Sequence, residues 1–133
     1  MVDGSFDPLH EGHIAYFSAA KELGNLVLCN ITSDDWTKSK HAILLEAPRR
    51  ALVIDAIKYV DFVHISSGST AAVLAELRPL IYAKGSDWKA RGGLPKEELE
   101  ICAKHSIQVV YLETVLNSST KILKKFSGES SKI

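Results

Sequence analysis

The chain has 133 residues, 46% of them hydrophobic, which suits one folded domain rather than a disordered chain. Its 16 basic and 16 acidic residues cancel, so the overall charge gives no reason to expect nucleic acid or a membrane surface as a partner. No apolar run approaches the roughly 20 residues of a membrane helix, and we find no signal-peptide pattern. Cys29 and Cys102 lack metal-binding or redox spacing, so we expect reduced core thiols in a cytoplasmic protein.

Short apolar runs alternate with helix-like patterns along the chain. The runs that predict buried parallel strands are 26–31, 62–65, 80–83 and 107–112. The segments that predict helices are 12–23, about 48–60, 70–77, about 95–105 and 118–126. This alternation predicts an α/β fold, a Rossmann-like, doubly wound parallel sheet covered by helices on both faces. Ligands of such sheets bind beyond the carboxyl ends of the strands.

Individual residues suggest where the helices begin, end and face the core. We expect Gly24 to end the first helix in the left-handed conformation and Ser69 or Thr70 to cap the third. Pro48 fits the first turn of the second helix. The apolar face of that second helix is expected at Leu52, Ala56, Ile57 and Val60.

The pattern predicts a single domain over residues 1–126 and a polar, frayed tail over 127–133. The first strand is unusually short in this scheme. Only Met1, Val2 and Asp3 precede the first glycine, whereas a buried central strand needs about five residues. We therefore expect a truncated first strand, and a chain that is cut from a longer one.

The segment 4–13 carries the clearest chemical signal. It reads GSFDPLHEGH and places His10 and His13 three residues apart at a predicted helix start. Residues at this spacing face the same way, and the first helical turn presents free backbone N–H groups and the positive end of the dipole. Gly12 would let a phosphate approach the backbone closely. Two imidazoles there could donate hydrogen bonds to a phosphoryl group that gains charge in its transition state.

The histidine spacing alone leaves two other interpretations open. The pair could lie on a surface loop without a role, or it could bind a metal ion. The metal interpretation is weaker, because no cysteine or acidic third ligand stands at a tight spacing.

Four elements, in order along the chain, resemble the cytidylyltransferase-like nucleotidyltransferases. GSFD followed by HEGH resembles the family's HxGH signature, and KGSDW at 84–88 resembles its KGxDW element. SSTKI at 118–122 resembles the STTxI start of the last helix, while RAL at 50–52 and YVD at 59–61 resemble the segment with the helix arginine. The resemblance covers nearly the whole chain and includes glycerol-phosphate cytidylyltransferases and heptose-phosphate adenylyltransferases.

The resemblance implies a direct displacement. The phosphate of an acceptor attacks the α-phosphate of a nucleoside triphosphate in line, and pyrophosphate leaves without a covalent enzyme intermediate. His10, His13 and Lys38 would be catalytic, with the histidines on the α-phosphate. Mg²⁺ would bind mainly through the triphosphate, so the resemblance implies no metal ligand from the protein.

The resemblance also assigns nucleotide binding to Gly4, Ser5, Phe6, Gly12, Lys40, Arg50, Lys84, Gly85, Asp87, Ser118, Ser119 and Thr120. Some of these have ordinary alternatives. Lys38 and Lys40 would also fit a solvated loop, and Arg50 the surface of its helix. The Ser-Ser-Thr run would cap a helix in any case, which is compatible with phosphate binding. Packing under a loop is the alternative for Trp88, and His41, His64 and His105 have no partner pattern.

The sequence thus predicts a nucleotidyltransferase that acts on a sugar-phosphate or polyol-phosphate. CTP is the expected donor, because the YVD turn and Asp87-Trp88 look closest to the glycerol-phosphate enzymes, although an arginine of those enzymes is absent from 113–118. Two alternatives remain, an adenylyltransferase acting on a heptose-like phosphate and a non-catalytic nucleotide-binding regulatory module. The family resemblance also suggests a homodimer.

Overall fold

The computed structural model describes residues 1–113 and 119–131. In this part of the chain the strands are β1 (Val2–Gly4), β2 (Leu28–Ile31), β3 (Phe62–Ile65), β4 (Ile81–Gly85) and β5 (Gln108–Leu112). The helices are α1 (Glu11–Lys21), α2 (Asp34–Lys38), α3 (Ala47–Asp55), α4 (Thr70–Leu77), α5 (Ser86–Ala90), α6 (Lys96–Lys104) and α7 (Ser119–Ser131). None of the described helices is both long and apolar enough to cross a membrane.

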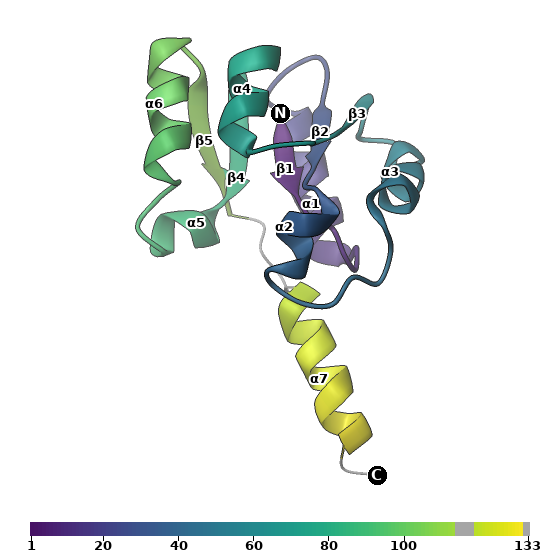
Figure 1. Cartoon of the computed structure of the whole chain (residues 1–133). Coiled ribbons are helices and arrows are strands. Elements are labelled where there is room, and N and C mark those ends of the chain that lie inside the picture. Colours follow the sequence, from purple (N-terminus) through teal and green to yellow (C-terminus); the bar gives the residue numbers. More distant parts are fainter. Residues whose placement is uncertain (114–118, 132–133) are drawn as a thin grey trace.

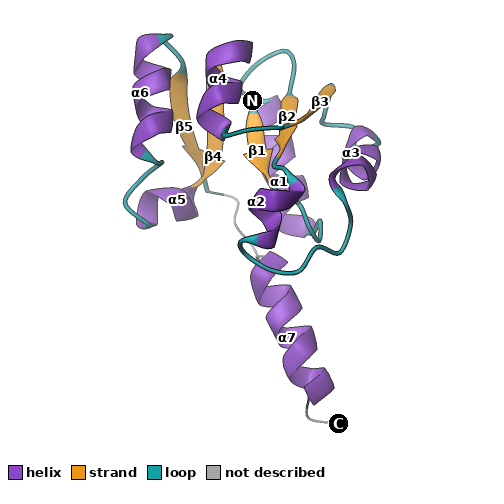
Figure 2. Cartoon of the chain, viewed as in Figure 1, coloured by secondary structure: helices purple, strands orange, loops and turns teal. Residues whose placement is uncertain are grey.

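The strands form a parallel sheet with helices around it (Figure 2). β1 pairs with β2 and β2 with β3, while β4 pairs with β5. β1 lies beside β4 (Figure 1), where the Met1 nitrogen donates to the Ile81 carbonyl at 2.6 Å and the Met1 carbonyl accepts from the Ala83 N–H at 2.9 Å. The spatial order is therefore β3-β2-β1-β4-β5, which confirms the predicted Rossmann-like architecture.

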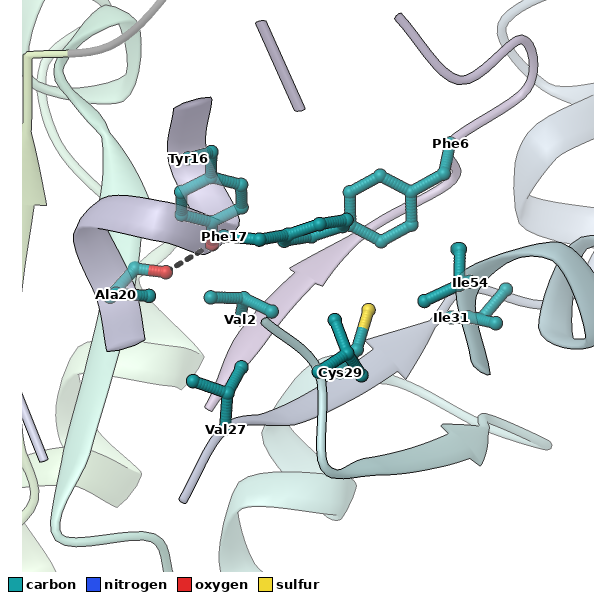
Figure 3. Packing of buried hydrophobic residues seen from close by; sticks show 11 residues of the cluster. Val2, Phe6, Tyr16, Phe17, Ala20, Val27, Cys29, Ile31 and Ile54 are labelled. Atoms are coloured by element: carbon teal, nitrogen blue, oxygen red, sulfur yellow. Dashed lines mark hydrogen bonds between the residues drawn. The ribbon is translucent and has the colours of Figure 1, made fainter. Parts of the chain in front are cut away.

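The sheet has a buried core on each face, because successive residues of a strand point to opposite sides. One core joins the strands to α1 and α3 through Val2, Phe17, Cys29, Ile31 and Ile54, among others (Figure 3). The second core joins β4 to α4 and α6 through Tyr82, Leu74 and Cys102. Cys29 and Cys102 are both buried and free, as expected.

β1 has only three residues, and its two faces differ in chemistry. Val2 points into the α1 core, whereas Asp3 is buried on the opposite face. There, Asn30 Nδ2 donates to Asp3 Oδ1 at 2.8 Å, and the Asn30 amide oxygen lies 2.8 Å from His64 Nδ1. The parallel register of β1, β2 and β3 thus lines up a row of polar side chains beside the carboxyl edge of the sheet, of which Asp3 and Asn30 are buried and His64 is half-buried.

Three local predictions were wrong. α1 ends at a right-handed Glu22 with φ −76°, so Gly24 does not form its left-handed cap. α3 buries Arg50 and Ile54 and leaves Leu52 75% exposed, because its contacts with β2 and β3 decide which side faces inward. Of the rest of the predicted face, Ala56 is exposed, whereas Ile57 and Val60, which follow the end of α3 at Asp55, do pack in the core. The last helix continues to Ser131, beyond the predicted end at residue 126.

Candidate active site

A pocket of about 190 Å³ opens beyond the carboxyl ends of β1 and β4. The loop after β1, the first turn of α1, the loop after α2, the start of α5 and the start of α7 all contribute to it. The predicted site residues that it brings together are Gly4, Ser5, Phe6, His10, Gly12, His13, Lys40, Lys84, Asp87, Ser119 and Thr120. Segments that are far apart in sequence therefore converge where a parallel sheet is expected to bind its ligand.

Four of the predicted site residues are not among the residues that line this pocket. Lys38 is exposed in the last turn of α2, and Gly85 is the N-cap of α5. Arg50 lies fully buried beside the loop after β1. Ser118 falls outside the described residues.

The Arg50 guanidinium binds protein groups rather than facing the pocket. Nε donates to the Leu45 carbonyl at 2.9 Å, and Nη1 donates to the carbonyls of Ser5 at 2.7 Å and Thr32 at 3.1 Å. Nη2 donates to the Asp34 carboxylate at 2.7 Å. Because Ser5 lines the pocket, Arg50 acts here as a positioning residue for the loop after β1.

The two histidines form the cap of α1. The Gly12 N–H donates to His10 Nδ1 at 3.1 Å, and the His10 N–H donates to His13 Nδ1 at 3.2 Å. An Nδ1 that accepts a hydrogen bond carries no proton, so the proton of each neutral imidazole sits on Nε2. The rings stack with centroids 3.8 Å apart, and Phe6 meets His13 edge-on at 4.9 Å. The helix cap therefore sets both the ring positions and the tautomers.

The surroundings keep both imidazoles uncharged near neutral pH. Burial lowers the pKa of His13 to about 3, with a smaller contribution from the neighbouring His10. Burial also lowers the pKa of His10, partly offset by Glu11. His10 Nε2 is buried and has no hydrogen-bond partner among the described residues. This N–H is a donor available to a ligand, because a buried donor without a partner is otherwise costly.

Cationic side chains line the same pocket as the histidine pair. Lys84 is 5% exposed, donates to the Asp3 carbonyl at 3.1 Å and lies 3.5 Å from the Asp3 carboxylate. Its Nζ also stands over the Trp88 ring at 4.9 Å. Lys40 lies on the loop after α2, where desolvation and then repulsion from Lys84 lower its pKa. An anionic ligand would relieve this repulsion, which makes the pocket suited to phosphate groups.

Buried polar contacts fix the loops that carry these groups. The Asp7 carboxylate is fully buried and accepts from the backbone N–H groups of Leu44 at 2.8 Å and Leu45 at 3.0 Å. The Ser119 hydroxyl donates to the Pro8 carbonyl at 2.7 Å. Asp7 thereby anchors the end of the loop that contains Lys40, and Ser119 anchors the start of α7 beside the histidines.

Sequence reasoning missed several groups at the pocket. Asp3, Tyr16 and Arg91 line it without having been predicted, as does His41, and Trp88 lines it rather than only packing under a loop. The Tyr16 hydroxyl accepts from the Asp3 N–H and donates to the Ala83 carbonyl, so it joins β1 to β4. Helical spacing could have indicated two of these residues, because Tyr16 follows His13 by three residues and Arg91 follows Asp87 by four. Arg91 and Asp87 form an ion pair at 3.2 Å.

The described residues contain no group of three histidine, cysteine or acidic side chains that could hold a metal ion. The two pocket carboxylates, Asp3 and Asp87, are each paired with a cation of the protein. A divalent cation would therefore fit this pocket best if a phosphorylated ligand supplied most of its oxygens.

Comparison with known proteins identifies the family and the fold. The model of the cytidylyltransferase-like family matches residues 1–128. The bifunctional protein HldE of Salmonella arizonae is 31% identical over 99% of this chain, and that of Pelobacter propionicus is 29% identical over 96%. These alignments cover 28% and 27% of the two relatives, so the chain spans less than a third of their length.

Two solved structures share the fold. A lipopolysaccharide core biosynthesis protein from Thermoplasma volcanium has a TM-score of 0.71 and 24% identity, and covers 86% of this chain and 94% of its own. A protein of unknown function from Archaeoglobus fulgidus has a TM-score of 0.63 and 21% identity, over 88% and 90% of the two chains. With the family match over residues 1–128, the chain belongs to the cytidylyltransferase-like family of nucleotidyltransferases.

Proposed function

We propose that this chain transfers a nucleoside monophosphate from a nucleoside triphosphate to a phosphorylated small-molecule acceptor and releases pyrophosphate. The observation that carries the proposal is the histidine pair. His10 and His13 are neutral, their Nδ1 atoms accept backbone N–H groups, and each therefore offers an Nε2–H. The same pocket contains Lys40 and Lys84.

The proposed step is a single in-line displacement. An oxygen of the acceptor phosphate forms a bond to the α-phosphorus as the bond from that phosphorus to the α–β bridging oxygen breaks, and pyrophosphate leaves. The Nε2–H groups of His10 and His13 donate to the α-phosphate oxygens, where negative charge builds up. Lys40 and Lys84 offset the charge of the phosphates, and the start of α7 with Thr120 receives the outer phosphates. Mg²⁺ bound through the oxygens of the triphosphate would supply further positive charge to the phosphates.

The base of the nucleotide is a separate question. The YVD turn that favoured CTP lies before β3, where the Asp61 carboxylate accepts from the Val27 N–H at 2.8 Å and binds Lys21 at 2.6 Å. Because Asp61 does not line the pocket, this turn gives no reason to choose cytosine. Asp87 and Trp88, the other basis for CTP, do line the pocket, so CTP remains the expected donor and ATP is tested beside it.

The experiment measures pyrophosphate release by the purified chain with Mg²⁺, CTP or ATP, and a panel of phosphate monoesters, with the nucleotide product identified by mass spectrometry. His10→Asn keeps a good helix N-cap but lacks the imidazole donor. Loss of one preorganised donor typically lowers turnover by about 10²–10³. We expect this loss for His10→Asn and for His13→Asn, with nucleotide affinity nearly unchanged.

The matched control is His105→Asn, which changes an imidazole after α6, outside the pocket. It should keep full turnover. Near-normal turnover in both pocket variants would refute the role of the histidines. Tight binding of CTP or ATP without pyrophosphate release for any acceptor would instead favour the non-catalytic nucleotide-binding module.

A further inference from the structure

A row of polar side chains crosses four neighbouring strands on one face of the sheet. His64 of β3, Asn30 of β2 and Asp3 of β1 are paired in the parallel register. Lys84 follows on β4, which lies beside β1 (Figure 1), and its ammonium is 3.5 Å from Asp3 Oδ2. The hydrogen bonds described above join His64 to Asn30 and Asn30 to Asp3, each at 2.8 Å. The row therefore connects the half-buried His64 to a cation of the pocket.

The direction of each hydrogen bond in this row follows from the Asp3 carboxylate. A carboxylate that faces an ammonium accepts hydrogen bonds and donates none, so Asn30 presents its NH₂ group to Asp3. The Asn30 amide oxygen then faces His64 and can only accept, which requires a proton on His64 Nδ1. In a neutral ring this is the opposite tautomer from that of His10 and His13, whose Nδ1 atoms accept. The row thus holds the Asp3 carboxylate from the side of β2.

The other carboxylate oxygen of Asp3 meets the pocket cation. The Thr70 hydroxyl donates to Oδ2 at 3.3 Å, and the Tyr82 hydroxyl lies 3.4 Å from it. The single proton of Tyr82 goes to Glu98 Oε1 at 2.8 Å, which is the shorter of its two contacts. The side chains of Asp3 and Lys84 are both buried, and buried charges of opposite sign depend on each other because water solvates neither of them well. The place of Oδ2 therefore determines where the Lys84 ammonium lies.

Lys84 needs such an anchor, because a lysine carries its charge on a flexible four-carbon stem. The main-chain carbonyl of Asp3 accepts from Nζ at 3.1 Å, in addition to the carboxylate contact. An ammonium has three N–H groups, so these two contacts leave a donor for a phosphate oxygen. Without the carboxylate, the ammonium would be free to move toward the ring of Trp88, at 4.9 Å, or of Tyr82, at 6.0 Å.

The charge of Asp3 and its anchoring effect act in opposite directions on a bound phosphate. A carboxylate that lines the pocket repels an anionic ligand, so it does not favour ground-state binding. A fixed ammonium, by contrast, helps when it has to meet a phosphate in a defined geometry. Removal of the carboxylate charge should therefore lower turnover without weakening the affinity for anions. A group that only stabilised the fold would not separate these two quantities.

On the basis of the nucleotidyl transfer proposed above, we propose that Asp3 is a positioning residue for Lys84 and that Asn30 and His64 orient its carboxylate. Asp3 acts through the ammonium that it holds and makes no contact with the phosphates itself. The machinery of the site then extends across the sheet to Asn30 and His64, neither of which lines the pocket.

Two NMR signals of the intact chain test this row without requiring turnover. The Lys84 ammonium, assigned by its absence in Lys84→Arg, should exchange slowly with water and give a resolved ¹H–¹⁵N signal. The signal should broaden beyond detection in Asp3→Asn, which has the same size but no charge, because a released ammonium exchanges its protons faster. Long-range ¹H–¹⁵N spectra above neutral pH should show His64 protonated on Nδ1. An unchanged Lys84 signal in Asp3→Asn, or His64 protonated on Nε2, would overturn the proposal.

Turnover and anion affinity test the effect on the proposed reaction. Asp3→Asn should lower pyrophosphate release roughly 10-fold to 100-fold, whereas its calorimetric affinity for inorganic pyrophosphate should stay the same or rise. In a Lys84→Met background, adding Asp3→Asn should change turnover by less than about twofold, because Asp3 acts through Lys84. If Lys84→Met fails to fold because the Asp3 charge is left unpaired, the turnover and affinity of Asp3→Asn decide. Weaker pyrophosphate binding in Asp3→Asn, or unchanged turnover, would contradict the positioning role.

The matched control is Asp61→Asn, because Asp61 also pairs with a lysine, Lys21 at 2.6 Å, but lies outside the pocket. It should keep the turnover and the pyrophosphate affinity of the unmodified chain. Equal losses of turnover in Asp61→Asn and Asp3→Asn would show a general effect on the fold and overturn the proposal. If the unmodified chain releases no pyrophosphate with any acceptor, the transfer reaction is refuted, and the two NMR signals still decide whether Asp3 holds Lys84.

Discussion

The buried histidine pair makes the stability of this protein sensitive to acid. The imidazole of an unfolded chain has a pKa of about 6.5, whereas burial lowers the pKa of folded His13 to about 3. Between these values the unfolded state binds a proton that the folded state does not, so the free energy of unfolding decreases as the pH falls. One proton corresponds to about 1.36 kcal/mol per pH unit, which gives a loss of roughly 2 kcal/mol between pH 6.5 and pH 5. The lowered pKa of His10 acts in the same direction.

Urea denaturation at pH 7 and pH 5 measures this effect in the unmodified chain and in His13→Asn, which does not titrate at position 13. Carboxylates that titrate in both proteins cancel in the comparison. We expect the unmodified chain to lose about 2 kcal/mol more than the variant over this interval. Equal losses in the two proteins would show that His13 can be protonated in the folded state, and the neutral-donor role would then be wrong.

Two further predictions concern the residues that hold the loops in place. Arg50→Met should lower the free energy of unfolding by about 3–5 kcal/mol in urea denaturation, because it leaves three backbone carbonyls without their donor and the Asp34 carboxylate without its cation. Arg49→Met, at an exposed neighbouring position, should change it by no more than about 0.5 kcal/mol, and similar effects of the two would refute the positioning role. Asp7→Asn should cost about 1–3 kcal/mol, since an amide nitrogen cannot accept the second loop N–H, and calorimetry should show weaker triphosphate binding. Unchanged triphosphate affinity would mean that this anchor does not position the Lys40 loop.

Most of the fold could be predicted from the sequence, because each buried parallel strand forms one continuous apolar run of the chain. The run 62–65 coincides with β3, and the other three predicted runs contain most of β2, β4 and β5. Pro48, Ser69 and Pro95 located the starts of α3, α4 and α6 in the same way, whereas the short helices α2 and α5 were not predicted. What local patterns could not predict was the buried face of α3, because Leu52 and Arg50 are distinguished only by which neighbour each meets in the folded chain.

The site was predictable to the extent that its residues follow strands or begin helices. His10, His13, Lys84 and Thr120 occupy such places, and the pocket brings them together. The role of Arg50 could not be predicted from the sequence, because its hydrogen-bond acceptors lie as far as 45 residues away. Its predicted phosphate role was inferred from the family resemblance alone. The position of Asp3 at the pocket could not be predicted either, since its place on the polar face of β1 depends on the register with β2. The roles of Arg50 and Asp3 therefore depend on contacts between segments that are far apart in the sequence.

The cap of α1 connects the fold to the proposed chemistry more directly than any other feature. In most helices the N-cap side chain only satisfies a backbone N–H. Here the two caps are the imidazoles, and accepting at Nδ1 is what forces the remaining proton onto Nε2. A histidine that swung out of the cap would be free to take the other tautomer or a second proton. The cap hydrogen bonds thus orient the rings and fix their tautomers, and burial keeps the rings uncharged. The same hydrogen bonds that begin the helix would therefore hold the two N–H donors ready for the phosphate contacts proposed above.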